Sequence, residues 1–353
     1  MFALDELLHY PVDWKDGMRV SAKDFVTTDR AWIDALRDVR STLFQGLQFG
    51  LLPALRDSSD TSAYPKLAFE PSRSLLILQE CRAITEGGYR IEITEDLHRE
   101  MQVPFKLPEV RVKSQEDFEV YITVDLFSPQ GAGKLLADAP PRHQYVCPFY
   151  ELSVLPKSEG VGLSGLNHLK IAEYKWAKAG FKRIDDYIPP CMVIAAHPLL
   201  TERFSKASGY LKTIHDNSIH LVRQYRSDPR PEVKDATLWV EKLVIFVAQS
   251  LWTYNDLLAN QSPTQTIVYF KNLAQYILST TNLYENNRFM KEGIRSQHPI
   301  FKDIADPNFT GEDLRTSFNR IDTALRSLHL WLKALSESFK TGREIKVEEI
   351  RNP

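Results

Sequence analysis

Cysteine and long apolar runs are scarce in this 353-residue sequence. Its three cysteines, Cys81, Cys147 and Cys191, are odd in number and far apart, which excludes a disulfide framework or a CxxC metal site and fits a reducing compartment. The most apolar stretch, residues 243–248, is far shorter than the roughly 20 residues that cross a bilayer. The N-terminus also lacks the basic and apolar regions of a signal peptide. We therefore expect a cytoplasmic protein with no direct membrane insertion.

An excess of charge of either sign is also missing. Lysine and arginine number 44 against 46 acidic residues, for a net charge of -2, so the composition gives no bulk attraction to nucleic acid or to an anionic membrane. Hydrophobic residues make up 43% of the chain and charged residues 25%, as in ordinary globular proteins. At this length two domains are expected.

Motifs that carry catalysis are incomplete. Residues 128–134, SPQGAGK, end like a phosphate-binding loop, but Ser128 replaces the first glycine and Leu135 stands where a hydroxyl would bind magnesium. We interpret this segment as a surface loop. His215 and His220 are five residues apart, not the four that would place two imidazoles on one metal, and no GxSxG nucleophile motif occurs. The sequence predicts that the protein is not an enzyme and has no catalytic, metal or cofactor residues. An enzyme with a dispersed site stays an alternative.

The first half of the chain has the pattern of β-strands. Along residues 117–127 apolar side chains alternate with polar ones, which is typical of an antiparallel strand with one solvated face. Gly87 and Gly88 join two β-rich runs as in a hairpin. Several short strands separated by turn signals predict an antiparallel β-sandwich.

One helix is expected ahead of these strands. Ser21 or Asp24 can cap it, and its apolar pattern continues to about Leu43. Its apolar side chains Phe25, Trp32 and Leu36 share one face.

The second half has a helical period. Helices are expected over residues 199–226, over residues 234–259 and from Pro263 onward. A fourth follows Thr310 and Asp313, whose spacing resembles a capping box.

These patterns together predict an α+β protein with two domains. An antiparallel β-sandwich would occupy residues 1–192, and a four-helix bundle residues 193–342. Residues 343–353 would form a short C-terminal tail.

The fourth predicted helix carries a narrow apolar seam. Its members alternate at spacings of four and three, a heptad pattern held for nearly four repeats. They are Leu314, Phe318, Ile321, Leu325, Leu328, Leu332, Leu335 and Phe339. Two interpretations stay open: the seam is the interior of the bundle, or it also meets its copies in an oligomer, since a narrow stripe suits a coiled-coil contact.

The opening residues 11–32, PVDWKDGMRVSAKDFVTTDRAW, are rich in the residue types that carry interface energy. A W-x-x-G-M phrase, followed by F and then by D-R, falls on Trp14, Gly17, Met18, Phe25, Asp29 and Arg30. Further phrases follow in order: PFYELSVLP at 148–156, GLNHLKIAE at 165–173 and YIPPCMVIAAHPLL at 187–200. In this order, the phrases resemble those of TssK proteins, the baseplate subunits of bacterial type VI secretion systems.

The resemblance implies a homotrimer without catalytic role. It implies a β-sandwich shoulder akin to phage receptor-binding proteins, a helical-bundle neck and a C-terminal head. The shoulder side would dock on the wedge proteins TssF and TssG, and the head would contact the membrane complex through TssL and TssM. Little sequence follows the fourth predicted helix, so we expect a shoulder and neck without the head, and the contact with TssL and TssM is not carried over.

We predict from these observations that Trp14, Gly17, Met18, Phe25 and Trp32 form a partner interface. The protein would then be a structural adaptor of a contractile injection baseplate, assembled at the inner face of the cell envelope. Two alternatives stay open. Trp14 and Phe25 can instead attach the first segment to the sandwich, or the chain can be a phage-tail-like receptor- or carbohydrate-binding module with an exposed aromatic platform.

Overall fold

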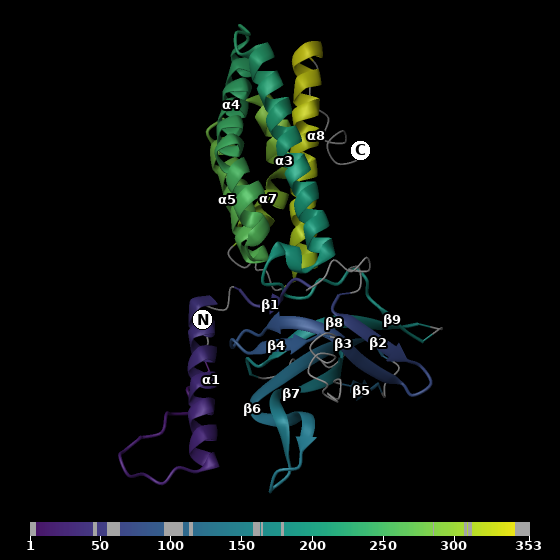
Figure 1. Cartoon of the computed structure of the whole chain (residues 1–353). Helices are drawn as coiled ribbons and strands as arrows, with labels where there is room; N and C mark the ends of the chain where they lie inside the picture. Colours follow the sequence, from purple (N-terminus) through teal and green to yellow (C-terminus); the bar gives the residue numbers. More distant parts are fainter. Residues whose placement is uncertain are drawn as a thin grey trace. The chain divides into compact units, whose positions relative to one another are not determined.

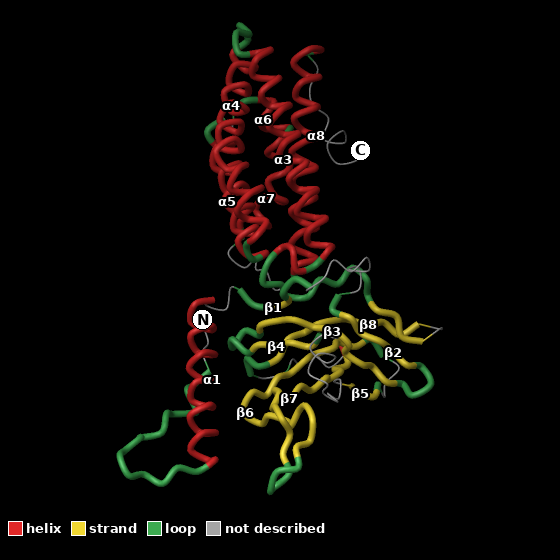
Figure 2. Tube along the Cα trace, viewed as in Figure 1, coloured by secondary structure: helices red, strands yellow, loops and turns green. Residues whose placement is uncertain are grey.

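The computed structural model describes residues 5–44, 48–54, 64–94, 109–112, 116–157, 163, 165–177, 180–284, 286–306, 309 and 313–342. The chain divides into two compact units, Met1–His197 and Pro198–Pro353. The first contains antiparallel strands and one long helix (Figure 1), and the second is helical (Figure 2). The expected α+β class, with antiparallel sheets, is confirmed.

The first sheet is arranged around one long strand, β3 (Leu75–Ile84). Its antiparallel partners are β1 (Gly50–Leu51), β2 (Lys66–Glu70), β4 (Arg90–Ile93) and β5 (Glu109–Arg111). The turn between β3 and β4 contains Gly87 and Gly88, so the hairpin predicted at this pair is confirmed.

The second sheet has the strand order β7-β6-β8-β9. Its strands are β6 (Phe118–Leu136), β7 (Arg142–Pro156), β8 (His168–Ala177) and β9 (Gly180–Arg183). The predicted alternation is confirmed at the start of β6, where Phe118, Val120 and Ile122 are buried. Tyr121 departs from it: its ring is also buried, and its hydroxyl donates to Glu119 Oε2 at 2.8 Å.

Residues 128–134 are not the surface loop that the sequence predicted. They belong to the second half of β6, where Gln130, Gly131 and Ala132 pair with Cys147, Val146 and Tyr145 of β7. The register shifts on both sides of this stretch, which is how a strand accommodates extra residues. The segment is therefore built as a strand and not as a phosphate-binding loop.

Aromatic side chains connect the two sheets. Phe118 of β6 stacks on Tyr174 of β8 with ring centroids 5.1 Å apart. Phe181 of β9 meets Phe118 at 4.8 Å and also meets Phe69 of β2, in the other sheet, at 5.6 Å. These edge-on and stacked contacts place side chains of both sheets in one apolar core.

In its described residues, the second unit contains the long helices expected from the sequence and two short α-helices that were not predicted. The long ones are α3 (Pro198–Tyr225), α4 (Pro231–Trp252), α5 (Pro263–Asn282) and α8 (Leu314–Thr341). The short ones are α6 (Arg288–Glu292) and α7 (His298–Ala305). After α4 the chain continues as a π-helical turn, Thr253–Leu257, and a 3₁₀ turn, Leu258–Asn260. In the part of the chain that the structure describes, no helix is both long and apolar enough to cross a membrane.

Large buried rings hold these helices together. Trp239 of α4 and Trp331 of α8 meet edge to face at 5.0 Å. Tyr254, in the π-helical turn, stacks on Phe204 of α3 at 4.3 Å and donates its hydroxyl proton to the Phe204 carbonyl at 3.0 Å. The turn thus satisfies a buried hydroxyl, which would otherwise destabilise the core.

The apolar seam lies on α8. Its eight side chains, Leu314 through Phe339, are all buried within the chain, as the interior interpretation requires. Asp313 is the N-cap, with its carboxylate accepting from the Thr316 N–H at 3.0 Å. Thr310, the other half of the expected capping box, lies outside the described residues, and so does the expected tail, 343–353.

Introducing a charge into the seam tests this placement. Leu325→Asp would bury a carboxylate at a position that is 2% exposed, at a cost of at least several kcal/mol. We expect the second unit to unfold, seen as a loss of far-UV helical signal and of cooperative thermal melting. Arg326→Asp, at the exposed neighbouring position, is the control and should fold normally. A folded Leu325→Asp variant would contradict this placement of α8.

Candidate assembly surface

The five predicted interface residues lie in α1 (Ala22–Phe44) and the segment before it. The first turn of α1 is fixed by a reciprocal cap. The Ser21 N–H and hydroxyl donate to Asp24 Oδ2 at 2.8 and 2.7 Å, and the Asp24 N–H donates to the Ser21 carbonyl at 3.1 Å. Both of the residues that the sequence offered as caps therefore take part.

The inner face of α1 is polar. Its buried side chains are Ala31, Asp34, Arg37 and Ser41. The Arg37 guanidinium donates from Nε and Nη2 to Asp34 Oδ1 at 2.9 and 2.8 Å, and both side chains are almost fully excluded from water, at 1% and 0% exposure. A fully buried ion pair, and not an apolar stripe, thus occupies the centre of this helix face.

The ion pair also holds the N-terminal segment against α1. Asp34 Oδ2 accepts hydrogen bonds from the backbone N–H groups of Leu8 and His9, at 2.6 and 3.0 Å. Arg37 donates to the Glu6 carbonyl at 3.1 Å. The backbone of residues 6–9 therefore supplies the additional polar partners that a buried charge pair needs.

The same face joins α1 to the sheets. The Arg37 guanidinium lies 5.4 Å from the centre of the Tyr89 ring, and Arg30 donates to the Phe127 carbonyl of β6 at 2.9 Å. Gly88 has a φ of 80°, and a Cβ there would lie 2.5 Å from the Arg37 carbonyl oxygen. Only glycine allows the β3–β4 turn to approach the helix backbone this closely.

The electrostatics of Asp34 follow from this environment. Burial by itself would raise the pKa of Asp34, but the His9 and Leu8 N–H groups and the Arg37 guanidinium outweigh it, and they hold the pKa below its usual value of 3.8. The carboxylate is therefore charged throughout the neutral range.

The outer face of α1 is apolar and faces solvent. We call its line of side chains the α1 stripe: Phe25, Trp32, Leu36, Val39 and Leu43, all exposed. Phe25, Trp32 and Leu36 share one face as predicted, but this face points away from the sheets, because the polar inner face is the one that is anchored. Phe25 is 60% and Trp32 66% exposed, so Phe25 does not attach the helix to the sheets.

The remaining predicted residues lie in the segment before α1. Trp14 is half exposed, and its ring lies 6.3 Å from that of Phe25. Gly17 is exposed in a tight turn, with a φ of 78°, and the turn is closed by the Met18 N–H donating to the Lys15 carbonyl at 3.2 Å. The structure thus brings Trp14 together with Phe25, while Trp32 lies farther along the same helix.

A second exposed apolar region lies on the paired outer ends of β6 and β7, which we call the β6–β7 arm. Its exposed apolar side chains are Leu135, Tyr145, Val146 and Phe149. The sequence did not predict this region, because residues 128–134 of β6 have the pattern of a surface loop.

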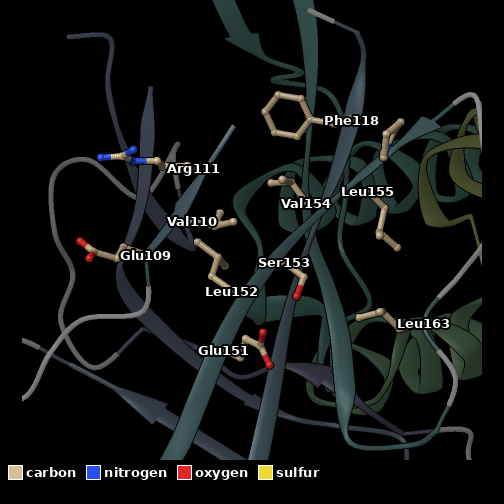
Figure 3. A pocket seen from close by; sticks show the side chains of 11 residues that line it. Glu109, Val110, Arg111, Phe118, Glu151, Leu152, Ser153, Val154, Leu155 and Leu163 are labelled. Carbon is tan, nitrogen blue, oxygen red and sulfur yellow. The ribbon is translucent and has the colours of Figure 1, made fainter. Parts of the chain in front are cut away.

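The hollow drawn in Figure 3 offers no catalytic arrangement. It measures about 790 Å³, is open, and lies along β5 and β7, with Val110, Leu152 and Val154 among its lining residues. Its polar lining consists of Glu109, Arg111, Glu151 and Ser153, and no histidine or cysteine lies beside Ser153 among the lining residues. In the described ranges, no group of three or more His, Cys, Asp or Glu residues is placed to hold a metal ion.

Removing one charge of the ion pair tests its role. Asp34→Asn removes the nearer of two carboxylates from the buried Arg37 and leaves only Asp5, whose Oδ2 lies 3.9 Å from Nη1. We expect the first unit to lose about 3 kcal/mol of stability or more at pH 7. Because the pKa of Asp34 is lowered, its contribution is present above about pH 4 and is lost as the pH falls through the folded pKa. Urea unfolding should show the difference between wild type and variant narrowing as the pH falls below 4.

Asp38→Asn makes the same chemical change on a half-buried residue of α1. It is the matched control and should lower the stability of the first unit only slightly. Amide exchange at pH 7 assigns the effect, because only Asp34→Asn should release the N–H groups of Leu8 and His9. Unchanged protection of these two amides would show that the ion pair does not hold the segment.

Comparison with solved structures shows that the fold is similar to those of TssK and of type VI secretion baseplate chains. The chain is similar to a crystal structure of TssK, with a TM-score of 0.58 and 12% identity over 90% of this chain and 69% of that one. It is similar to a chain of the type VI secretion baseplate complex (TM-score 0.58, 14% identity, 91% and 99% coverage). A chain of the TssK-TssF-TssG baseplate subcomplex matches with a TM-score of 0.51 and 13% identity, at 91% and 99% coverage.

No family model matches the sequence, and no curated protein matches it either. At these identities the likeness concerns the fold. The resemblance to TssK that the sequence phrases indicated is thus confirmed at the level of the fold, which the chain shares with structures of TssK and of type VI secretion baseplate complexes.

Proposed function

We propose that this chain is a non-enzymatic, structural component of a type VI secretion baseplate, a trimeric adaptor that docks on the TssF–TssG wedge. The observation that carries the proposal is the exposed apolar surface of α1 and its preceding segment, on a fold similar to that of TssK. Apolar patches of this kind on a protein surface mark interaction sites. A solved structure with the same fold comes from a TssK-TssF-TssG subcomplex, which supports the choice of partner.

The two units would serve as shoulder and neck. We propose that residues 1–192 form a shoulder-like β-sandwich, in which Phe181 joins the two sheets through Phe118 and Phe69. Residues 193–342 would form a neck built as a four-helix bundle of α3, α4, α5 and α8. The assembly would be cytoplasmic, at the inner face of the cell envelope, where it links the baseplate towards that envelope.

Wedge docking would use the segment before α1. Trp14 combines a large apolar ring with a half-exposed position, the type of residue that dominates binding energy at interfaces. The turn at Gly17 and Met18 fixes where the ring emerges, and Phe25 supports the ring from α1. Phe25 and Trp32 would extend the assembly surface along α1.

The oligomeric state is the first test. Light scattering on the purified chain at micromolar concentration should give a mass that is a multiple of three protomers, each of 40.6 kDa. A strictly monomeric protein under these conditions would count against the trimer.

Wedge binding is the second test. Trp14→Ala should weaken binding to a purified TssF–TssG complex by about tenfold or more in a titration, as expected for an aromatic hot spot, without lowering the thermal stability of the first unit. Trp252→Ala removes an exposed tryptophan of the second unit and is the control. Normal binding and normal stability of Trp14→Ala would remove this segment from the proposal.

A receptor- or carbohydrate-binding module is the second candidate. Tyr145 and Phe149 on the β6–β7 arm are exposed aromatic side chains, as stacking on sugar rings would require. A glycan array without binding would remove this candidate, while wedge binding would favour the first.

A further inference from the structure

The α1 stripe has the spacing of a coiled-coil seam. Phe25, Trp32, Leu36, Val39 and Leu43 follow one another at intervals of seven, four, three and four residues. Asp29 fills the one missing position, so that intervals of four and three alternate along the whole helix. An apolar repeat of 3.5 residues selects another helix as the partner, because each side chain then inserts between residues of the facing helix.

The stripe is large enough to carry an interface. Its two rings, 60% and 66% exposed, leave on the order of 200 Å² in contact with water. Val26 and Ile33, also exposed, widen it along one flank. Together with the aliphatic members of the stripe, they give it the size of the patches that mark protein interfaces.

Two charged residues of α1 favour an identical helix as the partner and an antiparallel orientation of the pair. Asp29 occupies the one position in the spacing of the stripe that is not apolar, and Arg40, eleven residues later, lies on the same side of the helix three turns away. In a parallel pair of identical helices, two Asp29 carboxylates would share one layer and repel each other. In an antiparallel pair, Asp29 of each helix lies beside Val39 and Arg40 of the other, which brings opposite charges together twice.

The same register pairs every apolar member of the stripe. When Asp29 lies opposite Val39, Phe25 lies opposite Leu43 and Trp32 lies opposite Leu36, with each contact occurring twice around a two-fold axis. The flanking positions also fit, since Thr28 meets Thr42 and Ala35 meets its own copy. No other charge of α1 enters the seam.

We propose that α1 of one chain pairs with α1 of a second copy as an antiparallel coiled coil, with Asp29 of each copy paired to Arg40 of the other. The pairing is a property of the chain by itself and does not depend on the proposed baseplate role. It names a second copy as the occupant of the outer face of α1, where Phe25 and Trp32 lie, and it leaves Trp14 and its turn as the part of the assembly surface that meets the wedge.

Disulfide trapping tests the direction of the pair. The background variant is Cys147→Ser, since Cys81 and Cys191 are buried. In this background Ala35→Cys should form a disulfide with its own copy under mild oxidation. Thr28→Cys and Thr42→Cys should each stay reduced alone and should form a mixed disulfide when combined. Self-linking of Thr28→Cys and Thr42→Cys would show a parallel arrangement, and no linking of any variant would remove the pairing altogether.

Charge reversal tests the specificity. Asp29→Arg and Arg40→Asp should each weaken self-association at least about tenfold in sedimentation equilibrium at low salt, and the double variant D29R/R40D should restore it. Lys23→Glu, a charge reversal outside the stripe, should leave association unchanged. If α1 binds a foreign helix instead, neither single reversal changes the mass of the purified protein, and the proposal fails.

This experiment separates the pairing from the proposed trimer. If the trimer and the α1 pairing are both correct, the wild-type protein has twice the molecular mass of Asp29→Arg or Arg40→Asp, and each of these two variants remains a trimer. If the pairing alone is correct, the single reversals are monomers. A wild-type protein that does not associate through α1 at any concentration contradicts the pairing whatever its trimeric state.

Discussion

The buried ion pair between Asp34 and Arg37 determines which way α1 faces. A surface helix of a globular protein usually turns its apolar side to the core. In α1 the reverse holds, because the two charges pair with each other and form hydrogen bonds with the backbone of residues 6–9, and the guanidinium also lies against the Tyr89 ring. Because this polar face is anchored, the apolar face points outward, where its side chains are exposed to solvent.

The rest of the first unit supports that arrangement. Arg30 reaches the Phe127 carbonyl, and Gly88 lets the β3–β4 turn approach the helix backbone. The rings of Phe118, Phe181 and Phe69 join the sheets that carry these anchoring points. The second unit has its own core around Trp239 and Trp331. By contrast, α1 presents an exposed apolar surface held in place by polar contacts, and this contrast supports the proposed role in assembly.

Much of the fold could be predicted from the sequence because apolar residues recur at regular intervals in several of its strands and helices. The alternation in β6, the Gly87–Gly88 hairpin and the heptad seam of α8 each bury one repeating face, and such repeats identify an element and its inner side. The short helices α6 and α7 escaped prediction because eight residues or fewer carry too little periodicity. The SPQGAGK segment was misinterpreted because its glycines and proline indicate a loop, whereas long-range pairing with β7 makes it a strand.

The candidate surface was predicted by residue type but not by orientation. Phe25, Trp32 and Leu36 were correctly placed on one face, yet a helix wheel cannot tell which face a tertiary contact will bury. The available signal was Asp34 and Arg37, spaced to pair on the opposite side of the helix, but their burial depends on Leu8, His9 and Tyr89, which are distant in sequence.

Hydroxyl-radical footprinting of the dilute protein tests the orientation of α1 most directly. Trp32 should be oxidised rapidly, at a rate close to that of the exposed Trp252, while Trp239 and Trp331 stay protected in their core. Protection of Trp32 equal to that of Trp239, in protein too dilute to associate, would mean that the apolar face of α1 is turned inward and would contradict this account.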